Sequence, residues 1–262
     1  MIDTVMRVVV PDKVRSKAGT WMMKQASRSK QLLAGYVKLV HGYDVADNLA
    51  IHDNVASYTF QDRRIACPID GVGSFFEVFC AEVYDKPWLF LRYGGVVIDV
   101  GAYTGMFAVK RAIAHQSVLA IEPCPDNWSW LQANTNKLPV TLVKCAAAEY
   151  VGEKTLYLSD TSSCHSTCYK QARSIEVPAK TLDRIAEEYG VGRVDLLKID
   201  AEGSEKEVLL GARVLLQHTE RVAIASYSDS DIRLMKAFLT ARGFKTQTSK
   251  GLRRYLYAEK GV

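Results

Sequence analysis

Apolar residues along this chain gather into short runs, and the clearest of these runs is Val96–Val100. Its apolar members are all β-branched and only Asp99 interrupts them, which is typical of a parallel strand buried on both faces. Gly101 and Gly105 follow directly, and residues 106–113 then repeat apolar positions at helical spacing. The pattern therefore predicts a strand, a glycine-containing turn and a helix in direct succession.

Similar runs alternate with helical patterns to the end of the chain. We expect further strands at 118–122, 140–144, 194–200, 221–226, 244–249 and 254–259, and helices at 127–134, 181–189, 206–216 and 230–242. The last two strands are joined by a short turn around Gly251 and should pair antiparallel. This order predicts an α/β fold with a seven-stranded, mostly parallel sheet and one antiparallel edge strand. Residues 154–158 and 175–178 alternate and are expected to form a peripheral ribbon.

The first part of the chain has a different pattern. Trp21–Met23 and Leu32–Val40 carry apolar residues three and four positions apart, which indicates two short amphipathic helices. We therefore expect a helical extension over residues 1–64 and the main domain over 65–262. The apolar faces of these helices need a partner surface, either the sheet of this chain or a second subunit in a homo-oligomer, and the sequence leaves both open.

Composition narrows the class of protein. The chain has 262 residues, of which 48% are hydrophobic, and a net charge of +5. No apolar run approaches the ~20 residues that span a bilayer. Six cysteines without regular spacing favour a reducing, cytoplasmic location. Seven Lys or Arg residues and no acidic residue lie between Lys13 and Tyr43, so this block is either a solvated helical face or a contact for nucleic acid, membrane or an acidic partner.

The spacing of the glycine turn indicates a class of ligand. A turn of this kind lets the backbone approach a ligand, with free helix N–H groups pointing at it. A dinucleotide fingerprint requires a middle glycine, which makes room for a pyrophosphate. Tyr103 stands at that middle position and would crowd a diphosphate. S-adenosylmethionine, which has no phosphate and presents an ammonium and a carboxylate, fits Asp99 and the helix end better. A turn whose glycines serve only packing remains the alternative.

Acidic residues also stand at the ends of other expected strands, where a ligand could bind. Glu122 and Pro123 come after the glycine turn at about the spacing (~20 residues) of the acid that binds a ribose in nucleotide folds. Asp200 and Glu202 end the fourth strand, and open α/β sheets bind ligands at the carboxyl ends of their strands. With Asp99, these carboxylates would repel one another unless a cation or hydroxyl donors share the space. A cationic cofactor and a hydroxyl substrate would meet that need.

Three further features are weaker candidates. The ring of Tyr84 could face a sulfonium, although a packed aromatic is the simpler interpretation. Small residues around Ala146 could leave a slot for a flat base, or could serve tight packing. The polar loop 160–168 contains Cys164, His165 and Cys168, but no second Cys/His pair completes a zinc site, so we expect no metal. We expect a mobile loop on the substrate side instead.

The sequence resembles the FkbM family of S-adenosylmethionine-dependent methyltransferases over about residues 65–216. The resemblance rests on Asp99–Gly105, Glu122–Asn127, Val177–Asp183, Val194–Glu205 and Val208–Ala212. It implies a class I (Rossmann-like) methyltransferase fold and methyl transfer to a hydroxyl oxygen of a sugar or small natural product.

The resemblance also implies roles for individual residues. The methionine part of the cofactor would be lined by Gly101, Ala102, Tyr103, Thr104 and Gly105. Glu122 would hold the ribose, and residues near Ala146 would lie by the adenine. Asp200 and Glu202 would face the methyl group and the acceptor. We expect Asp200 to orient or deprotonate the acceptor, with support from Glu202.

This chain departs from the family pattern at two places. Tyr103–Thr104 stands where the family often has Asn-Ile, and Ala225–Tyr227 stands where it commonly has Glu-x-His. The second departure implies another base or a different acceptor. Two alternatives therefore stay open: an RNA methyltransferase that uses the basic N-terminal region, and a non-catalytic cofactor-binding or assembly protein. The absence of an Asn-Pro-Pro-Tyr motif argues against the first.

Overall fold

The computed structural model describes residues 49–80, 82–85, 93–249 and 254–261. The chain divides into two compact units, Met1–Glu82 and Val83–Val262. None of the helices in the described ranges is long and apolar enough to cross a membrane.

The first unit contains a small antiparallel sheet. Its strands are β1 (Leu49–His52), β2 (Val55–Phe60) and β3 (Arg63–Pro68), in the order β1-β2-β3. A 3-10 turn η1 (Ile69–Gly71), α4 (Val72–Phe75) and the π-helical turn η2 (Phe76–Cys80) follow. Aromatic rings hold these parts together, since Tyr58 lies 4.2 Å from Phe75 and Phe60 lies 4.9 Å from Phe79, centroid to centroid.

This sheet corrects part of the expected helical extension. Residues 49–64 form strands rather than helices, and β3 runs through residue 64, where we expected a boundary. Tight turns explain the difference, because Asp53, Gln61 and Asp62 all adopt positive φ between the strands. The helices expected within Trp21–Val40, and any subunit contact through them, lie outside the described residues.

The second unit is built on the expected seven-stranded sheet, in the order β12-β13-β11-β10-β4-β5-β6. The strands are β4 (Val96–Val100), β5 (Ser117–Ile121), β6 (Val140–Val143), β10 (Leu196–Ile199), β11 (Arg221–Ser226), β12 (Phe244–Thr248) and β13 (Arg254–Lys260). Only β13 is reversed, and it pairs antiparallel with both β11 and β12. We expected the reversed strand to lie at the edge of the sheet. It lies one position inside the edge instead, because β12 pairs along its outer side.

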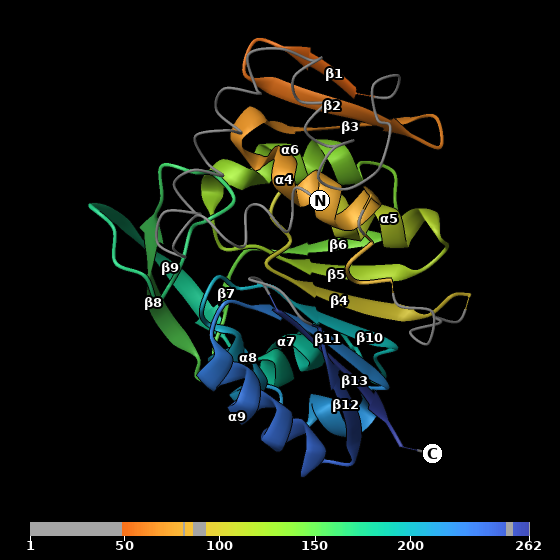
Figure 1. Ribbon diagram of the computed structural model, residues 1–262, viewed down its shortest axis with the longest axis vertical. Coiled ribbons are helices and arrows are strands. Elements are labelled where there is room, and N and C mark those ends of the chain that lie inside the picture. The colour runs from red at the N-terminus through yellow and green to blue at the C-terminus, as the bar shows by residue number, and fades with distance from the viewer. Residues whose placement is uncertain (1–48, 81, 86–92, 250–253, 262) are drawn as a thin grey trace, which may run out of the picture. The chain divides into compact units, whose positions relative to one another are not determined.

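Helices cover both faces of this sheet. They are α5 (Met106–Ile113), α6 (Pro125–Thr135), α7 (Leu182–Glu188), α8 (Glu205–Leu210), η3 (Leu215–His218) and α9 (Asp229–Thr240). Figure 1 shows α5 and α6 on one side and α7, α8 and α9 on the other. On the second side, side chains such as Ile98, Leu182 and Met235 belong to one continuous buried core. The apolar runs of the sequence thus become the centre of the unit.

The helices α7 and α6 begin in different ways. Thr181 caps α7, accepting a bond from the amide of Arg184 at 3.0 Å. Asp126 lies inside the first turn of α6 and is not its cap. The reason is Pro125, which takes the first helical position and moves the cap to Cys124.

A second, smaller sheet lies beyond β6. It contains β7 (Ala146–Ala147), β8 (Gly152–Leu158) and β9 (Arg173–Lys180) in the order β7-β9-β8. β8 and β9 pair antiparallel and form the expected ribbon. The chain between them returns to β8 at Ser166, which bridges Tyr157. The polar loop singled out in the sequence is therefore held against the end of β8.

The turn after β4 depends on the absence of a side chain at Gly101. Its φ is +72°, and a Cβ there would lie 1.8 Å from the carbonyl oxygen of Asp200. The backbone at the ends of β4 and β10 is therefore closer than any other residue would allow.

We predict that Gly101→Ala destabilises the protein far more than Gly190→Ala. Gly190 also has a positive φ (+66°), but a Cβ there would meet nothing within 4 Å. The control should lose about 1 kcal/mol from backbone strain alone, whereas Gly101→Ala adds a backbone clash and should lose about 3 kcal/mol or more. Urea unfolding of both variants measures the difference. Equal losses would show that the close approach at Gly101 is not needed.

Candidate active site

Strand register brings three of the expected site residues to one edge of the sheet. Val100 pairs with Ile199 on one side and with Ile121 on the other. The next residue of each strand is Asp200, Gly101 or Glu122, so these three positions follow one another across the carboxyl ends of β10, β4 and β5. Parallel strands that end together in this way form the ligand crevice of open α/β sheets.

Asp99 lies in β4 two residues before Gly101 and is fully buried. The ammonium of Lys198 lies 2.8 Å from its Oδ1. The same ammonium donates to the carbonyl oxygens of Gly101 at 2.9 Å and Val100 at 3.3 Å. Burial raises the pKa of Asp99, and the charge of Lys198 offsets part of that shift. We expected Asp99 to meet a ligand ammonium, and the structure gives it the ammonium of Lys198.

Lys198 was missed by sequence reasoning. It stands in β10 between apolar residues, in Leu196–Ile199, and its side chain is buried. A lysine in such a run needs partners for three N–H donors. That anomaly was the available signal, but the sequence could not tell which groups the lysine would meet.

The residues between the two glycines of the turn are buried. Tyr103 adopts a positive φ (52°) and its hydroxyl lies 2.6 Å from Ser162 Oγ. Ala102 and Thr104 are buried, and the carbonyl of Thr104 accepts a bond from Asn134 at 2.7 Å. Among the described residues, the hydroxyl of Thr104 has no hydrogen-bond partner. A buried hydroxyl of this kind is a group that a ligand can satisfy.

Glu122 is held by the chain on several sides. Its Oε2 accepts from the amide of Tyr103 at 2.8 Å. Its Oε1 accepts from the amide of Cys124 and from Asn127 Nδ2, each at 3.0 Å. Burial raises the pKa of Glu122, and these donors offset part of the shift. A carboxylate offers about four acceptor positions, so these three bonds leave capacity for a further donor. Asn127 was not singled out in the sequence, although it lies in the helix that follows Glu122.

The turn after β10 carries the other two expected carboxylates. Asp200 Oδ2 accepts a hydrogen bond from the hydroxyl of Tyr84 at 2.9 Å. Glu202 has a positive φ (47°), and its carbonyl accepts from Ser166 Oγ at 2.6 Å. The structure therefore fixes the backbone at Glu202. Support of Asp200 by the Glu202 carboxylate stays a prediction.

Glu205 shapes the same turn and was missed by sequence reasoning. Its Oε1 accepts from the amides of Ala201 at 3.1 Å and Gly203 at 2.9 Å. Its side chain is buried, and this burial, with the nearby charge of Asp200, raises the pKa of Glu205 to about 7. A carboxyl group that accepts two backbone donors within four residues fixes the loop that presents Asp200.

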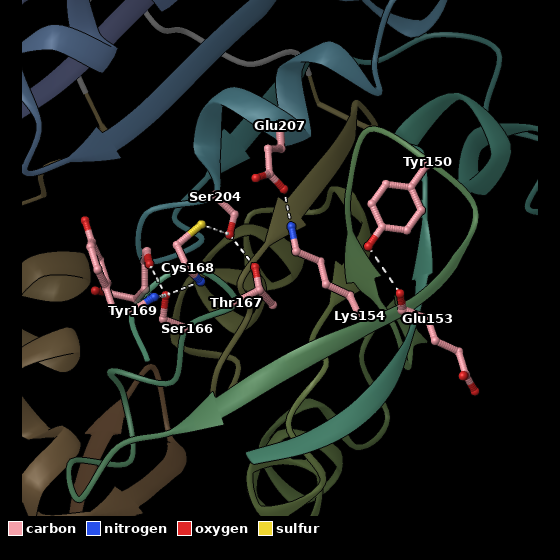
Figure 2. Close-up of polar contacts among 10 residues, drawn as sticks. Tyr150, Glu153, Lys154, Ser166, Thr167, Cys168, Tyr169, Ser204 and Glu207 are labelled. Carbon is pink, nitrogen blue, oxygen red and sulfur yellow. Dashed lines mark hydrogen bonds and ion pairs between the residues drawn. The ribbon is translucent and has the colours of Figure 1, made fainter. Parts of the chain in front are cut away.

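The polar loop after β8 lies against this turn (Figure 2). Ser166 Oγ also accepts from the amides of Cys168 at 3.0 Å and Tyr169 at 3.1 Å. Thr167 and Cys168 both contact the hydroxyl of Ser204, the second at 3.3 Å. The ring of Tyr169 packs on Gly203, where a Cβ would lie 2.8 Å from it. The loop expected on the substrate side thus touches the residues that follow Asp200, while its mobility stays a prediction.

The remaining residues singled out in the sequence are Ala146, Pro123 and the Cys and His residues of the polar loop. Ala146 is buried and packs with Cys124, two residues beyond Glu122. Pro123 leads into α6 and is half-buried. His165 Nδ1 accepts from the amide of Ser159 at 3.0 Å. In the described part of the chain, no group of three or more His, Cys, Asp or Glu side chains is placed to hold a metal ion.

A groove of about 560 Å³ lies elsewhere, at the amino ends of the strands. Its lining includes Val96, Ser117, Val140, Tyr189 and Arg193. These residues begin β4, β5 and β6 or precede β10, so the groove is separated from the carboxylates by the length of the strands. This groove is therefore distinct from the candidate site, which is marked by the polar groups at the carboxyl ends of the strands.

We predict that Ser166→Ala lowers the free energy of unfolding by about 1–3 kcal/mol. The change leaves the carbonyl of Glu202 and two backbone amides without their partner. Ser163→Ala is the matched control, because its hydroxyl has only a long 3.8 Å contact with Cys164 Sγ among the hydrogen bonds of this loop. The control should stay within about 0.5 kcal/mol of the native protein in urea unfolding. Equal effects would show that Ser166 does not fix the loop.

We predict that Glu205 makes stability fall as pH rises. Its pKa is about 7 in the folded state against an ordinary value of 4.5. Between these values the folded state binds a proton that the unfolded state lacks, so the free energy of unfolding decreases from about pH 4.5 to 7. Glu205→Gln keeps an acceptor oxygen and removes the titration. Urea unfolding from pH 5 to 8 should show the native protein losing stability relative to this variant, and a constant difference would contradict the assignment.

Known proteins supply an independent comparison. The model of the methyltransferase FkbM domain matches residues 99–246, which is more than half of the chain. The 31-O-demethyl-FK506 methyltransferase FkbM of Streptomyces tacrolimicus is 26% identical over 203 residues, covering 64% of this chain and 78% of that relative. The hexuronic acid methyltransferase AglP of Haloferax volcanii is 24% identical over 157 residues, covering 59% of this chain and 65% of that relative.

Solved structures give only a distant likeness. A SAM-dependent methyltransferase from Agrobacterium tumefaciens superimposes with a TM-score of 0.46 at 9% identity, covering 81% of this chain and 72% of that one. The strand order with one reversed strand next to the edge is that of the class I methyltransferase fold. On the match of the family model, which starts at Asp99 and extends into β12, the chain belongs to the FkbM methyltransferase family.

Proposed function

We propose that this protein transfers a methyl group from S-adenosylmethionine to a hydroxyl oxygen of a sugar or small natural product. One observation carries the proposal. The strand register brings Asp200 and Glu122 to either side of the glycine turn at Gly101. A carboxylate for a ribose and a carboxylate for an acceptor hydroxyl are thus separated by a backbone turn that a ligand can approach.

The residues at this edge fit the cofactor. Gly101 lets the chain turn at a positive φ beside the backbone of Asp200, and Thr104 has a buried hydroxyl with no partner among the described residues. Glu122 retains acceptor capacity after its three bonds. In this proposal the turn Gly101–Gly105 holds the methionine part, Glu122 holds the ribose, and Ala146 lies by the adenine. The side chain of Tyr84 is 2% exposed and packs against Phe107 and Tyr255, which favours a packed aromatic over a ring that faces a sulfonium.

The chemistry asked of the protein is then limited. When bound, the cofactor supplies a methyl group on a sulfonium that leaves readily. Asp200 orients the acceptor hydroxyl and takes its proton, because an alcohol oxygen becomes a strong nucleophile only as the proton departs. Glu202, on the same turn, supports it. The turn itself is fixed by Glu205 and Ser166, and such fixation keeps the acceptor in line with the methyl group.

The name of one relative supports an oxygen acceptor, since it gives the 31-O position of a demethylated FK506. Another relative is named for hexuronic acid, which supports a sugar derivative as the acceptor. The basic block between residues 13 and 43 lies outside the described residues, so no structural observation favours an RNA acceptor.

We predict that Asp200→Asn keeps cofactor binding and loses methyl transfer by about 100-fold or more, since it removes the proton acceptor. Calorimetry with S-adenosylmethionine measures binding. Transfer of labelled methyl is measured on hexuronic acid glycosides, neutral hexosides and macrolide alcohols. Asp195→Asn is the control, because Asp195 accepts from the amide of Val96 at the opposite end of the strands, and it should keep native activity.

Three outcomes would contradict parts of this proposal. Full turnover by Asp200→Asn would show that Asp200 is not the base. Failure of the native protein to bind S-adenosylmethionine would show that it is not the cofactor. Binding without turnover on any acceptor class would favour a non-catalytic role, in agreement with Ala225–Tyr227 standing where relatives commonly have Glu-x-His.

A further inference from the structure

The segment just before β4 places one side chain directly on the candidate base. The hydroxyl of Tyr84 donates to Asp200 Oδ2 at 2.9 Å, across 116 residues of sequence. Tyr84 is 2% exposed and Asp200 is half-buried, so the donor lies inside the protein and the acceptor is partly open to solvent. A buried hydroxyl bonded to a carboxylate forms a charge-assisted bond, which is stronger and more directional than a bond between neutral groups.

Two basic side chains of α5 hold the chain at Tyr84 and Asp85. Arg111 donates to the carbonyl of Tyr84 at 3.2 Å. The next residue, Asp85, forms ion pairs with Arg111 and with Lys110, the second at 2.7 Å. Both basic residues lie in the last turn of α5, where cations are favoured by the helix dipole. One of these contacts holds the carbonyl of Tyr84, and the other two hold the side chain of the next residue.

The ring of Tyr84 is fixed as firmly as its backbone. Phe107 meets it edge to face at 5.3 Å, and Tyr255 does so at 5.7 Å. The ammonium of Lys198 lies 5.7 Å from the ring centre. Two aromatic contacts and a buried cation restrict the orientation of the ring. Its hydroxyl therefore points at Asp200 because of packing, before any ligand is considered.

The electrostatic surroundings of Asp200 make this hydroxyl important. Burial raises the pKa of the Asp99 and Glu205 carboxyl groups, and the nearby charge of Asp200 adds to both shifts. Lys198, a buried cation in the strand that ends at Asp200, pairs with Asp99 and with backbone carbonyls. The hydroxyl of Tyr84 gives Asp200 a neutral hydrogen-bond donor. A donor to the charged form of a carboxylate stabilises that form and fixes the plane of the group.

We propose that Tyr84 is the positioning residue for Asp200, holding its carboxylate charged and in a set orientation for the acceptor. This inference rests on the proposed function, since it assigns Asp200 the role of base. Tyr84 acts through its hydroxyl, whereas a contact between its ring and a sulfonium would use the ring face. The two roles are separable, because phenylalanine keeps the ring and removes only the hydroxyl.

The test is the titration of the Asp200 carboxyl, followed by carbon-13 NMR on the full chain. In Tyr84→Phe the midpoint of Asp200 should move up by about one pH unit, because the charged form loses a donor. Tyr257→Phe is the matched control. Tyr257 is also buried and donates to the carbonyl of Val83, next to Tyr84, at 2.7 Å. Its loss removes a comparable bond to the same segment and should leave the Asp200 midpoint unchanged.

A second change keeps the test decisive if Tyr84→Phe does not fold. Incorporation of 3-fluorotyrosine at position 84 makes the phenol a stronger donor and should move the Asp200 midpoint down. No shift in either Tyr84 variant, or an equal shift in Tyr257→Phe, would overturn the inference. Calorimetry of the native protein with S-adenosylmethionine is run alongside. Failure there counts against the proposed function, whereas the NMR midpoints count for or against Tyr84.

Discussion

The arrangement of this site depends on the contacts of one buried cation, the ammonium of Lys198. It binds Asp99 and the carbonyl oxygens of Val100 and Gly101, and so connects β10 to the end of β4 and the turn that follows. Breaking a buried pair by removing one partner typically costs about 3–5 kcal/mol, because an uncompensated charge remains. The approach of the two strand ends at Gly101 therefore depends on a cation inside the sheet.

The same principle explains how several carboxyl groups share one edge of a sheet. Glu122 accepts two backbone amides and one side-chain amide, and Asp200 accepts from a tyrosine hydroxyl. Glu205 accepts two backbone amides, and burial raises its pKa to about 7. The sequence indicated that these charges would need a cation or hydroxyl donors. The protein supplies the cation and one hydroxyl from its own side chains, so the edge is ordered before a ligand binds.

Most of the main sheet could be predicted, because buried parallel strands leave continuous β-branched runs such as Val96–Val100. The expected positions of Asp200 and Glu122 followed from those runs. The position of β13 could not be predicted, because the local hairpin fixes its pairing with β12 but not which side of it meets β11. The roles of Lys198 and Ser166 were equally hidden, since their partners lie about 98 and 36 residues away in sequence and only the tertiary fold brings them together.

The central claim is that the carboxyl ends of β4, β5 and β10 bind one sulfonium nucleoside. A crystal structure of the protein with S-adenosylhomocysteine tests it most directly. The account predicts ribose hydroxyls within hydrogen-bonding distance of the Glu122 carboxylate and the amino-acid part of the ligand on the Gly101–Gly105 turn. A ligand bound instead in the groove at the amino ends of the strands, beside Arg193, would contradict it.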